Sequence, residues 1–490
     1  MAEYLHGAYG QIQAVGTKVA IKSQNAIVYV GTAPVHTVAG GAANVNRPIL
    51  VTNIAEARKY FGYSDEWDKY TLCEAMHAHL ENKAVGPLVL INVLDPSVHV
   101  AEESGSVSMT PENGRVSIVN AGDIILDSVA VTGKTNGTDY TAQYDFKKKL
   151  LTIAEITPGA LGDEAITITY DSVDASKVDA DDVIGATDGA GLNTGLFAIQ
   201  NVYQETGFIP SFLLAPGFSS NPAVHSAMIH NSQKVNSHWD VYVLADIPIV
   251  DTGSEKVTLA SAATWKNTNG YNKPNETVYF PLAKGTDDKV YHLSVLAAAN
   301  FQELLVAQDG IPYKTASNTD CEIISNLYMG EESAGRVFDD SLINRVLNKN
   351  GIASAAYVGG RWAIWGCHSA DYNAESGDEM NVAETNRMML YYISNDFQHR
   401  RTRNVDKQLT SNDIKTIVAE EQTRLDALVK IGAITYGECH LNAEADARSD
   451  IMNGDYTFTF NVTTTPLARS VTAIVNWTND GFVTYFADIV

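Results

Sequence analysis

The chain has 490 residues, of which 34 are basic and 58 acidic, so its formal net charge is -24. A field of this sign repels the phosphate backbone of nucleic acids, and we therefore expect no direct nucleic-acid partner. No run approaches the roughly 18 apolar residues of a membrane span, and the first residues lack the basic and apolar regions of a signal peptide, so neither membrane insertion nor secretion by a signal peptide is expected.

The four cysteines are irregularly spaced and none belongs to a CxxC pair. This pattern favours reduced thiols over a disulfide framework. At about 100–200 residues per domain, the length indicates about three domains.

Residues 1–20 are rich in glycine and small side chains and show no amphipathic period. Their large side chains include Tyr4, Tyr9 and Ile12, which are too sparse to form a core. The segment is therefore predicted to be an extended N-terminal arm.

Strands and helices alternate on both sides of a central block. A strand is predicted at 26–30, then a helix that begins at Asn53, with Glu56 completing a capping-box pattern, and ends at Gly62. Helices at 67–82, 194–206 and 221–236 and strands at 88–93, 211–215 and 241–245 continue the alternation, which is typical of a mostly parallel sheet. We expect residues 21–96 and 190–360 to form one α/β core.

The block between them, residues 97–189, has short strands rich in Thr, Val and Ile. The Asn136-Gly137 pair between the segments 129–132 and 140–144 predicts a hairpin. Residues 97–190 contain 16 acidic and 6 basic residues, and so carry much of the net charge. We expect a separate β-sandwich-like domain.

Residues 361–480 are predicted to form a third, α+β unit. It begins with a strand at 361–365, continues with a helix at 382–397 and a long helix from Thr410 to Gly432, and ends with strands at 456–462 and 470–477.

The last ten residues, 481–490, are a second arm. Apolar side chains occupy both faces of this strand-like segment: Phe482, Val483, Tyr485, Phe486 and Ile489. A free end of this kind aggregates unless another strand covers it. Two arms without a partner in the same chain suggest strand exchange between subunits.

Motifs of catalytic or ligand-binding proteins occur only in fragments. Gly133-Lys134-Thr135 ends like a P-loop, but Ser128 stands where that motif needs glycine, so a turn is the better interpretation. Asp251-Thr252-Gly253 resembles a protease aspartate motif, yet the second aspartate motif and the serine context are missing.

The neighbouring pairs Cys367-His368 and Cys439-His440 place their side chains on opposite faces of a strand. His77 and His79 are likewise separated on a helix. We therefore assign no catalytic, cofactor-binding or metal-ligating residue and expect no cofactor.

The order of parts resembles contractile tail sheath proteins over nearly the whole chain. The resemblance rests on the segments Ile27–Pro34 and Gly360–Gly366, the predicted pair of C-terminal strands and the apolar tail Phe482–Val490. No single motif carries it.

The resemblance implies a subtilisin-like, non-catalytic core, a C-terminal domain that lies against an inner tail tube, and arms that add strands to neighbouring subunits. It implies a homo-oligomeric sheath of stacked, hexameric rings, with the tube, baseplate and tail terminator proteins as partners. The sheath would be assembled in the bacterial host cytoplasm and would act in a virion tail or released tail-like particle, driving the tube through a bacterial envelope.

One dense basic run, with three further basic residues on the long helix, stands out in the acidic chain. The residues are Arg400, Arg401, Arg403, Lys415, Arg424 and Lys430. The plain interpretation is a solvated face; the functional hypothesis is a surface that faces an acidic tube.

Two other classes of function remain to be weighed. A hydrolase on a subtilisin-like scaffold would need a catalytic triad, which the sequence does not show. A carbohydrate-binding tail fibre would need β-dominated repeats, whereas this chain has a large α/β core.

Overall fold

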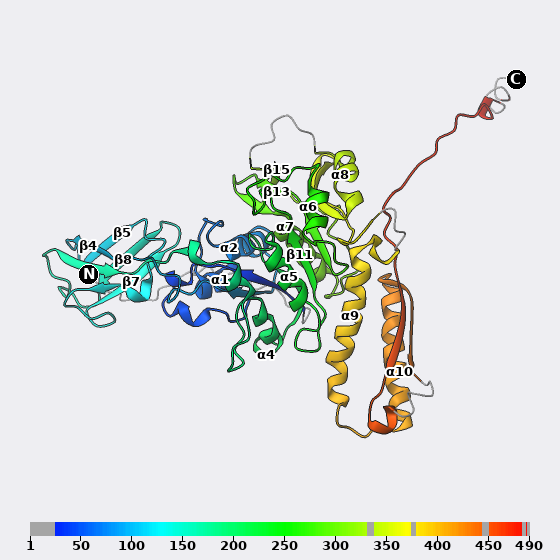
Figure 1. Cartoon of the computed structure of the whole chain (residues 1–490), viewed down its shortest axis with the longest axis horizontal. Coiled ribbons are helices and arrows are strands. Elements are labelled where there is room, and N and C mark those ends of the chain that lie inside the picture. Colours follow the sequence, from blue (N-terminus) through cyan, green and yellow to red (C-terminus); the bar gives the residue numbers. More distant parts are fainter. Residues whose placement is uncertain (1–24, 331–337, 374–378, 443–449, 483–486, 488–490) are drawn as a thin grey trace. The chain divides into compact units, whose positions relative to one another are not determined.

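The computed structural model describes residues 25–330, 338–373, 379–442, 450–482 and 487 (Figure 1). The chain divides into two compact units, Met1–Asp413 and Ile414–Val490. The N-terminal arm residues Tyr4, Tyr9 and Ile12 lie outside the described residues.

An eight-stranded sheet forms the centre of the first unit. Its order is β17-β16-β12-β11-β10-β1-β3-β2, parallel from β16 to β3, with an antiparallel strand at each edge. The predicted α/β architecture is confirmed. The strands are β1 Asn25–Gly31, β2 Ile49–Val51, β3 Leu88–Asn92, β10 Ile209–Leu214, β11 Tyr242–Asp246, β12 Glu276–Tyr279, β16 Ile352–Val358 and β17 Arg361–Trp365.

The outer edge of β17 is covered by the chain itself. The backbone N–H groups of Asn318 and Cys321 donate to the carbonyls of Ile364 and Trp362, and the N–H of Ile364 donates to Thr319. At this edge, the sheet is therefore hydrogen-bonded to the loop formed by residues 318–321.

Helix α1, Ile54–Phe61, begins and ends at the predicted residues. The Asn53 side chain accepts from the Glu56 N–H at 3.0 Å, and Gly62 follows with φ of 72°. The Glu56 carboxylate caps the N–H of Thr52 rather than that of Asn53. The predicted helix 67–82 begins later, as α2 Thr71–Ala75 and the π-helix η3 Met76–Asn82.

Helices cover the sheet and connect its strands (Figure 1). Helix α7 is almost entirely buried, and a three-stranded sheet, β14-β13-β15, adjoins it. The bounds are η6 Gly195–Asn201, α4 Val202–Thr206, α5 Pro222–Asn231, α6 Ala262–Thr268, β13 Leu282–Gly285, β14 Val290–His292, α7 Leu293–Ala307, β15 Ile324–Tyr328, α8 Asp340–Val346 and α9 Glu384–Arg401.

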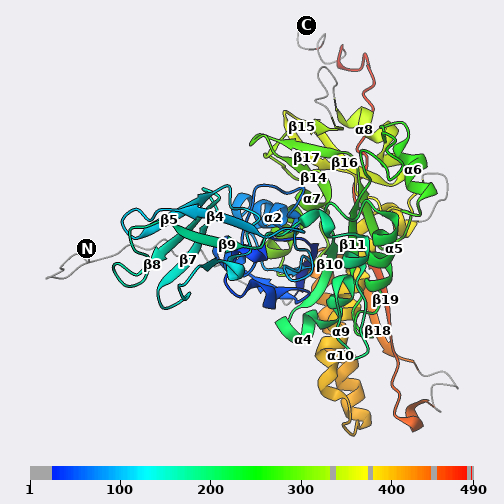
Figure 2. The ribbon, with the colours of Figure 1, turned by 60° about the vertical axis from the view of Figure 1, so that its left-hand side comes forward.

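Residues 105–170 form two three-stranded antiparallel sheets, β4-β9-β6 and β5-β8-β7, with an apolar cluster of their own. We call this region the β part (Figure 2). Its strands are β4 Gly105–Met109, β5 Arg115–Val119, β6 Ala130–Val131, β7 Tyr140–Asp145, β8 Leu150–Glu155 and β9 Ile166–Tyr170.

The predicted hairpin across Asn136-Gly137 is wrong. β6 pairs with β9, and β7 pairs with β8, so the two flanking strands belong to different sheets. The Tyr140 side chain explains the difference, because its hydroxyl donates to the Val129 carbonyl and accepts from the Val131 N–H. A side-chain contact thus replaces the expected backbone pairing.

The predicted start of a third unit at residue 361 is also corrected. Because β17 pairs with β16, residues 361–365 belong to the sheet of the first unit, and the division between units follows Asp413.

The second unit contains a long helix and a two-stranded antiparallel sheet. Its elements are α10 Ser411–Lys430, which begins just before the division, β18 Ile434–Leu441 and β19 Phe458–Thr464. The predicted second strand, Ser470–Trp477, is not a strand, and β19 pairs with β18 instead. Among the described residues, no helix is both long and apolar enough to cross a membrane.

Candidate assembly site

The second unit presents a small sheet that is supported on one side by α10. The α10 residues Ile417, Leu425 and Leu428 are buried, and a Cβ at Gly437 of β18 would lie 2.9 Å from Leu425. Glycine therefore allows the helix to approach the strand closely.

Gln422 ties α10 to the backbone of β18. Its amide donates to the Gly437 carbonyl at 3.0 Å and accepts from the Cys439 N–H at 3.1 Å. A two-stranded sheet is marginally stable in water by itself, and these contacts supply part of the missing support.

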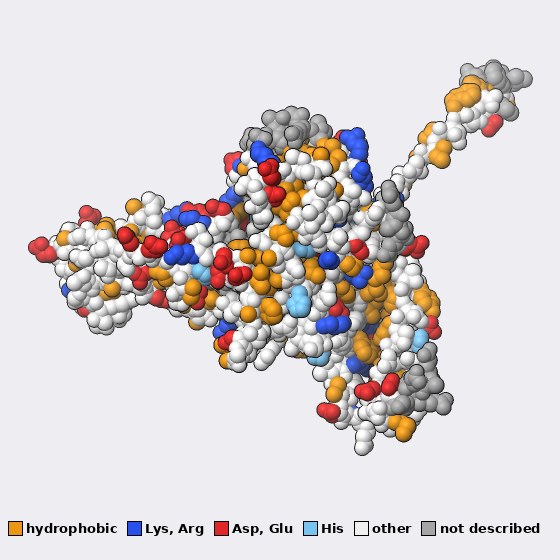
Figure 3. Space-filling view, in the orientation of Figure 1, with side chains coloured by type: hydrophobic (Ala, Val, Ile, Leu, Met, Phe, Trp, Pro, Cys, Tyr) orange, Lys and Arg blue, Asp and Glu red, His pale blue; other side chains and the backbone are white. Residues whose placement is uncertain are grey.

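The chain after β19 is extended and exposed. Pro466–Asn479 forms no helix or strand, and hydrophobic side chains are exposed along it (Figure 3). Four large apolar side chains are more than four-fifths exposed. They are Val471 at 89%, Ile474 at 83%, Val475 at 90% and Trp477 at 82%. In an extended conformation Val471, Val475 and Trp477 share one face, because side chains alternate along a strand. We call this segment the C-terminal apolar segment.

The predicted C-terminal arm is only partly described. Phe482 is 52% exposed and lies in a helical turn with Gly481, not in a strand. Val483, Tyr485, Phe486 and Ile489 lie outside the described residues. The apolar segment at 471–477, which we predicted to be an internal strand, therefore extends the candidate arm toward β19.

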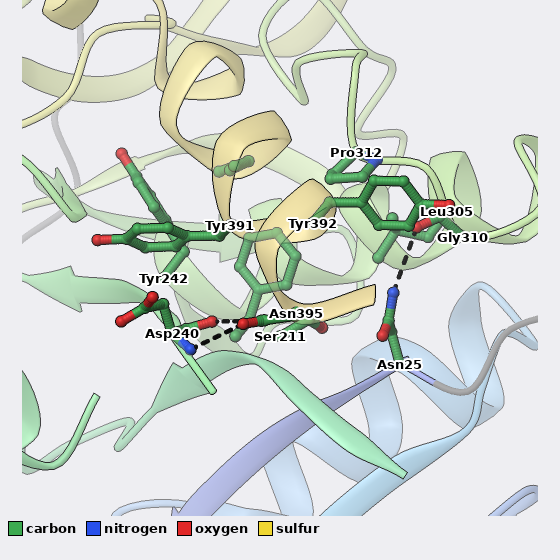
Figure 4. A pocket seen from close by; sticks show the side chains of 12 residues that line it. Asn25, Ser211, Asp240, Tyr242, Leu305, Gly310, Pro312, Tyr391, Tyr392 and Asn395 are labelled. Carbon is green, nitrogen blue, oxygen red and sulfur yellow. Dashed lines mark hydrogen bonds between the residues drawn. The ribbon is translucent and has the colours of Figure 1, made fainter. Parts of the chain in front are cut away.

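Asn25, at the start of β1, is the first described residue. Its amide donates to the Gly310 carbonyl at 3.4 Å, beside a cavity of about 30 Å³ next to α9 (Figure 4). The Asn395 amide of α9 bonds both the N–H and the carbonyl of Asp240, at 3.0 and 2.8 Å. The described part of the chain thus begins at the amino ends of the parallel strands, beside α9.

The six basic residues of the hypothetical tube-facing surface are not equally accessible. Arg403, Lys415 and Lys430 are exposed. Arg400 pairs with Asp396 at 2.7 Å, and Arg401 is only 9% exposed. Arg424 is half-buried. Helix α10 also carries four acidic residues against three basic ones, so its surface has mixed charge.

The carboxyl ends of the parallel strands, where α/β proteins commonly bind ligands, are filled by the protein's own side chains. Asp246 of β11 is buried and accepts from the N–H of Ser294 at 3.1 Å and from its hydroxyl at 2.5 Å. Burial raises the pKa of Asp246.

A second pair, of buried Glu74 and half-buried His292, lies close by. The Glu74 carboxylate contacts the ring Nδ1 of His292 at 2.7 Å and accepts a hydrogen bond from the backbone N–H of His292 at 2.5 Å. Burial disfavours the imidazolium, but the adjacent Glu74 charge outweighs it and raises the pKa of His292 to about 9. These groups satisfy one another instead of facing a ligand.

Thr71, at the start of α2, closes the end of β1. Its N–H donates to the Thr32 hydroxyl at 3.1 Å, and its own hydroxyl accepts from the Thr32 N–H at 3.3 Å. A Cβ at Gly31 would lie 2.3 Å from the Thr71 hydroxyl oxygen. The glycine is therefore needed for this close packing.

The fragments of catalytic motifs form turns. The Asp251 side chain accepts from the N–H groups of Gly253 and Glu255 at 2.9 and 2.8 Å. Lys134 and Thr135 lie in the connection between β6 and β7, in which no helix begins. In the described part of the chain, no three His, Cys, Asp or Glu side chains gather closely enough to hold a metal ion.

No protein family model matches the chain. It is similar to the curated tail sheath protein of Burkholderia phage BcepMu, with 28% identity over 231 residues. That match covers 46% of this chain and 45% of the phage protein, so it spans less than half the length of the curated relative.

Solved structures extend the comparison to almost the whole chain. The sheath complex of an extracellular contractile injection system, PVC, in its contracted state has a TM-score of 0.54 at 10% identity, and 98% of each chain is covered. The chain has the fold of contractile sheath proteins. The helical sheath of the anti-feeding prophage, also contracted, gives a TM-score of 0.52 at 11% identity over 98% of this chain and all of that one. The resemblance to tail sheath proteins inferred from the sequence is thereby confirmed, and the sheath fold includes both units described above.

Proposed function

We propose that this chain is a structural, non-catalytic subunit of a contractile tail sheath. It polymerises as stacked hexameric rings around an inner tube and, on contraction, drives the tube through a bacterial envelope. The observation that carries the proposal is the exposed C-terminal apolar segment, a surface that a soluble monomer does not need, on a chain with the sheath fold.

Strand exchange between subunits follows from this segment. Val471, Val475 and Trp477 would lie on one face of an added strand, and covering them removes apolar surface from water. The two-stranded sheet β18-β19 is the natural acceptor in a neighbouring copy, since sheets of three or more strands are more stable. The N-terminal arm, with Tyr4, Tyr9 and Ile12, would add a further strand.

The domain roles complete the proposal. We assign a subtilisin-like core to residues 21–96 and 190–360, extended by the corrected strand at 361–365, and an inserted β-sandwich to residues 97–189, supported by the separate apolar cluster of the β part. The second unit would face the tube through Lys415 and Lys430, which are exposed. Arg403 of the first unit is the other exposed residue of the six and is a separate candidate for a tube contact.

The remaining partners are the baseplate and tail terminator proteins, and no cofactor is required. Assembly would take place in the host cytoplasm, and the subunit would act in a virion tail or a released tail-like particle. The hydrolase alternative gains no support from the filled carboxyl ends of the strands.

The test is electron microscopy of three purified proteins at rising concentration: the full chain, a chain ending at Asn479 and a chain ending at Arg469. Only the last lacks the C-terminal apolar segment. Striated tubes or stacked rings from the full chain, reduced by the first truncation and abolished by the second, are expected.

A tube protein from the same tail is added to samples that remain monomeric, since a sheath can need its tube as a template. A full chain that forms no rings or tubes with or without the tube protein would contradict the proposal. If the chain that ends at Arg469 assembles like the full chain, strand exchange is contradicted, but the role as a sheath subunit is not.

A further inference from the structure

The β part rests on the core through a narrow polar contact. Glu66 of the core pairs with Lys69 at 3.0 Å and with Lys149 of the β part. Asp123 of the β part accepts from the Tyr70 hydroxyl at 3.1 Å and lies 3.7 Å from the Lys69 ammonium. The charged side chains are between 38% and 50% exposed. We call these four charged residues the polar latch.

Little apolar packing supplements the latch. The apolar cluster of the β part is separate from that of the core, and Ile125 is the side chain between β5 and β6 that packs on the larger cluster. Two further contacts are hydrogen bonds, from His36 to the Gly122 carbonyl and from the Gly40 N–H to Asp127, both at 2.8 Å.

The two crossings of the chain between core and β part lie side by side. The N–H of Ala101 donates to the Ser172 carbonyl at 2.8 Å, and the N–H of Asp174 donates to the His99 carbonyl at 2.9 Å. The His99 ring also contacts the Asp182 carboxylate at 3.2 Å. Paired crossings make one link, about which a body can rotate, whereas separated crossings would prevent rotation.

Open space flanks the latch. A cleft of about 800 Å³ separates the polar face of the sheet β5-β8-β7, with Arg115, Gln143 and Thr152, from a core wall that includes Arg58 and Glu81. A second cleft, of about 750 Å³, lies between Asp68 and Lys69 of the core and the β part. The two clefts therefore leave space beside the latch on either side.

We propose that the β part is a rigid body that rocks on the paired link, residues 99–101 and 172–174, and that the polar latch of Glu66, Lys69, Asp123 and Lys149 holds it in the orientation seen here.

The strength of the latch depends on ionic strength. Exposed ion pairs are individually weak and are screened by salt, with a screening length of about 10 Å at 0.1 M and about 3 Å at 1 M. The Lys149 and Lys69 ammonium groups lower the pKa of the Glu66 carboxyl, so it stays charged throughout the neutral range. Salt and substitution of Glu66 should therefore release the same motion.

The experiment measures distances between two spin labels on either side of the larger cleft. The label sites are Ala55→Cys on α1 and Lys147→Cys in the turn after β7, both exposed. Cys367→Ser removes the native cysteine that is not buried. Pulsed electron resonance is recorded at low salt and in 1 M NaCl, below the concentration at which the chain polymerises.

A narrow distribution of distances at low salt that becomes at least about twice as wide in 1 M NaCl is expected, because screening removes the latch. Glu66→Gln should give the wide distribution already at low salt and respond little to added salt. The matched control, Glu103→Gln, removes an exposed carboxylate just before β4, outside the latch, and should behave like the parent.

A distribution unchanged by salt and by Glu66→Gln would show a rigid junction and overturn the proposal. Equal broadening in Glu103→Gln would show an effect of net charge and overturn the role of the latch. If Glu66→Gln does not fold, the salt series on the parent decides the question. The result is independent of the proposed function, since a monomer suffices.

Discussion

Replacing Trp477 by alanine should weaken polymerisation without weakening the monomer. A tryptophan side chain can bury about 200 Å², and Trp477 is 82% exposed in the single chain. Covering that exposed part in a neighbour removes about 160 Å², worth about 4 kcal/mol at about 25 cal/mol per Å². Ordering the side chain costs about 1 kcal/mol, which leaves about 3 kcal/mol per subunit.

A loss of this size raises the critical concentration for polymerisation by about 100-fold. Sedimentation of polymer across a dilution series measures it, and thermal unfolding of the monomer should be unchanged. Met452→Ala is the matched control, because Met452 is 88% exposed in the same unit but outside the C-terminal apolar segment. An unchanged critical concentration for Trp477→Ala, or an equal change for Met452→Ala, would refute the reasoning.

Three further predictions concern the core. The pKa of His292 is raised to about 9 beside Glu74, so the contribution of this pair to the free energy of unfolding should be complete below about pH 6.5 and fall by up to about 3 kcal/mol by pH 9. In unfolding curves measured across this pH range, Glu74→Gln should remove most of the fall. Burial raises the pKa of Glu384 to about 7, so the folded state holds a proton that the unfolded state loses, and stability should fall between about pH 4.5 and 7; Glu384→Gln should remove that slope. Gly31→Ala should destabilise by about 2 kcal/mol through contact with Thr71, measured by denaturant unfolding, and Thr71→Ala should relieve part of the loss.

Each of these has its own control. The Glu384 carboxylate accepts from the hydroxyls of Thr277 and Thr315, so a slope that persists in Glu384→Gln would assign it to another group. For His292, a slope between pH 6.5 and 9 that is unchanged in Glu74→Gln would contradict the pairing. The control for Gly31→Ala is Gly189→Ala, whose added methyl group meets no atom within 4 Å and should hardly change the free energy of unfolding. If the losses of Gly31→Ala and Thr71→Ala simply add in the double variant, the methyl group added at position 31 does not clash with Thr71.

Local signals in the sequence predicted several helix ends, although the helix expected from 67 begins at Thr71 and the one expected to reach 236 ends at Asn231. The Asn53 cap and the glycines 62, 207 and 432 stand at or beside the expected helix ends, and each of these glycines has a positive φ. Such signals succeed because the hydrogen bonds involved lie within a few residues of one another.

Pairings between distant residues were not predictable in the same way. The strand at 361–365 joined the core sheet because of its register with β16, and the Tyr140 hydroxyl displaced an expected hairpin. The Glu74–His292 pair joins residues 218 positions apart. Periodicity carries no information about such partners.

The candidate assembly site was predicted in part. The apolar character of the chain's end was evident from the sequence, but the exposure of residues 471–477 was not, because an alternating apolar segment is equally typical of an internal strand. Only the pairing of β19 with β18 shows that this segment is left outside the sheet.

The loop that covers β17 affects how concentrated subunits behave before they assemble. An open strand edge on the largest sheet would let any two copies fuse side to side, a route to amorphous deposits. Here residues 318–321 occupy that edge, so crowding alone cannot join two cores through it. In the proposed sheath, attachment through segments near the chain ends would then not compete with pairing at this edge.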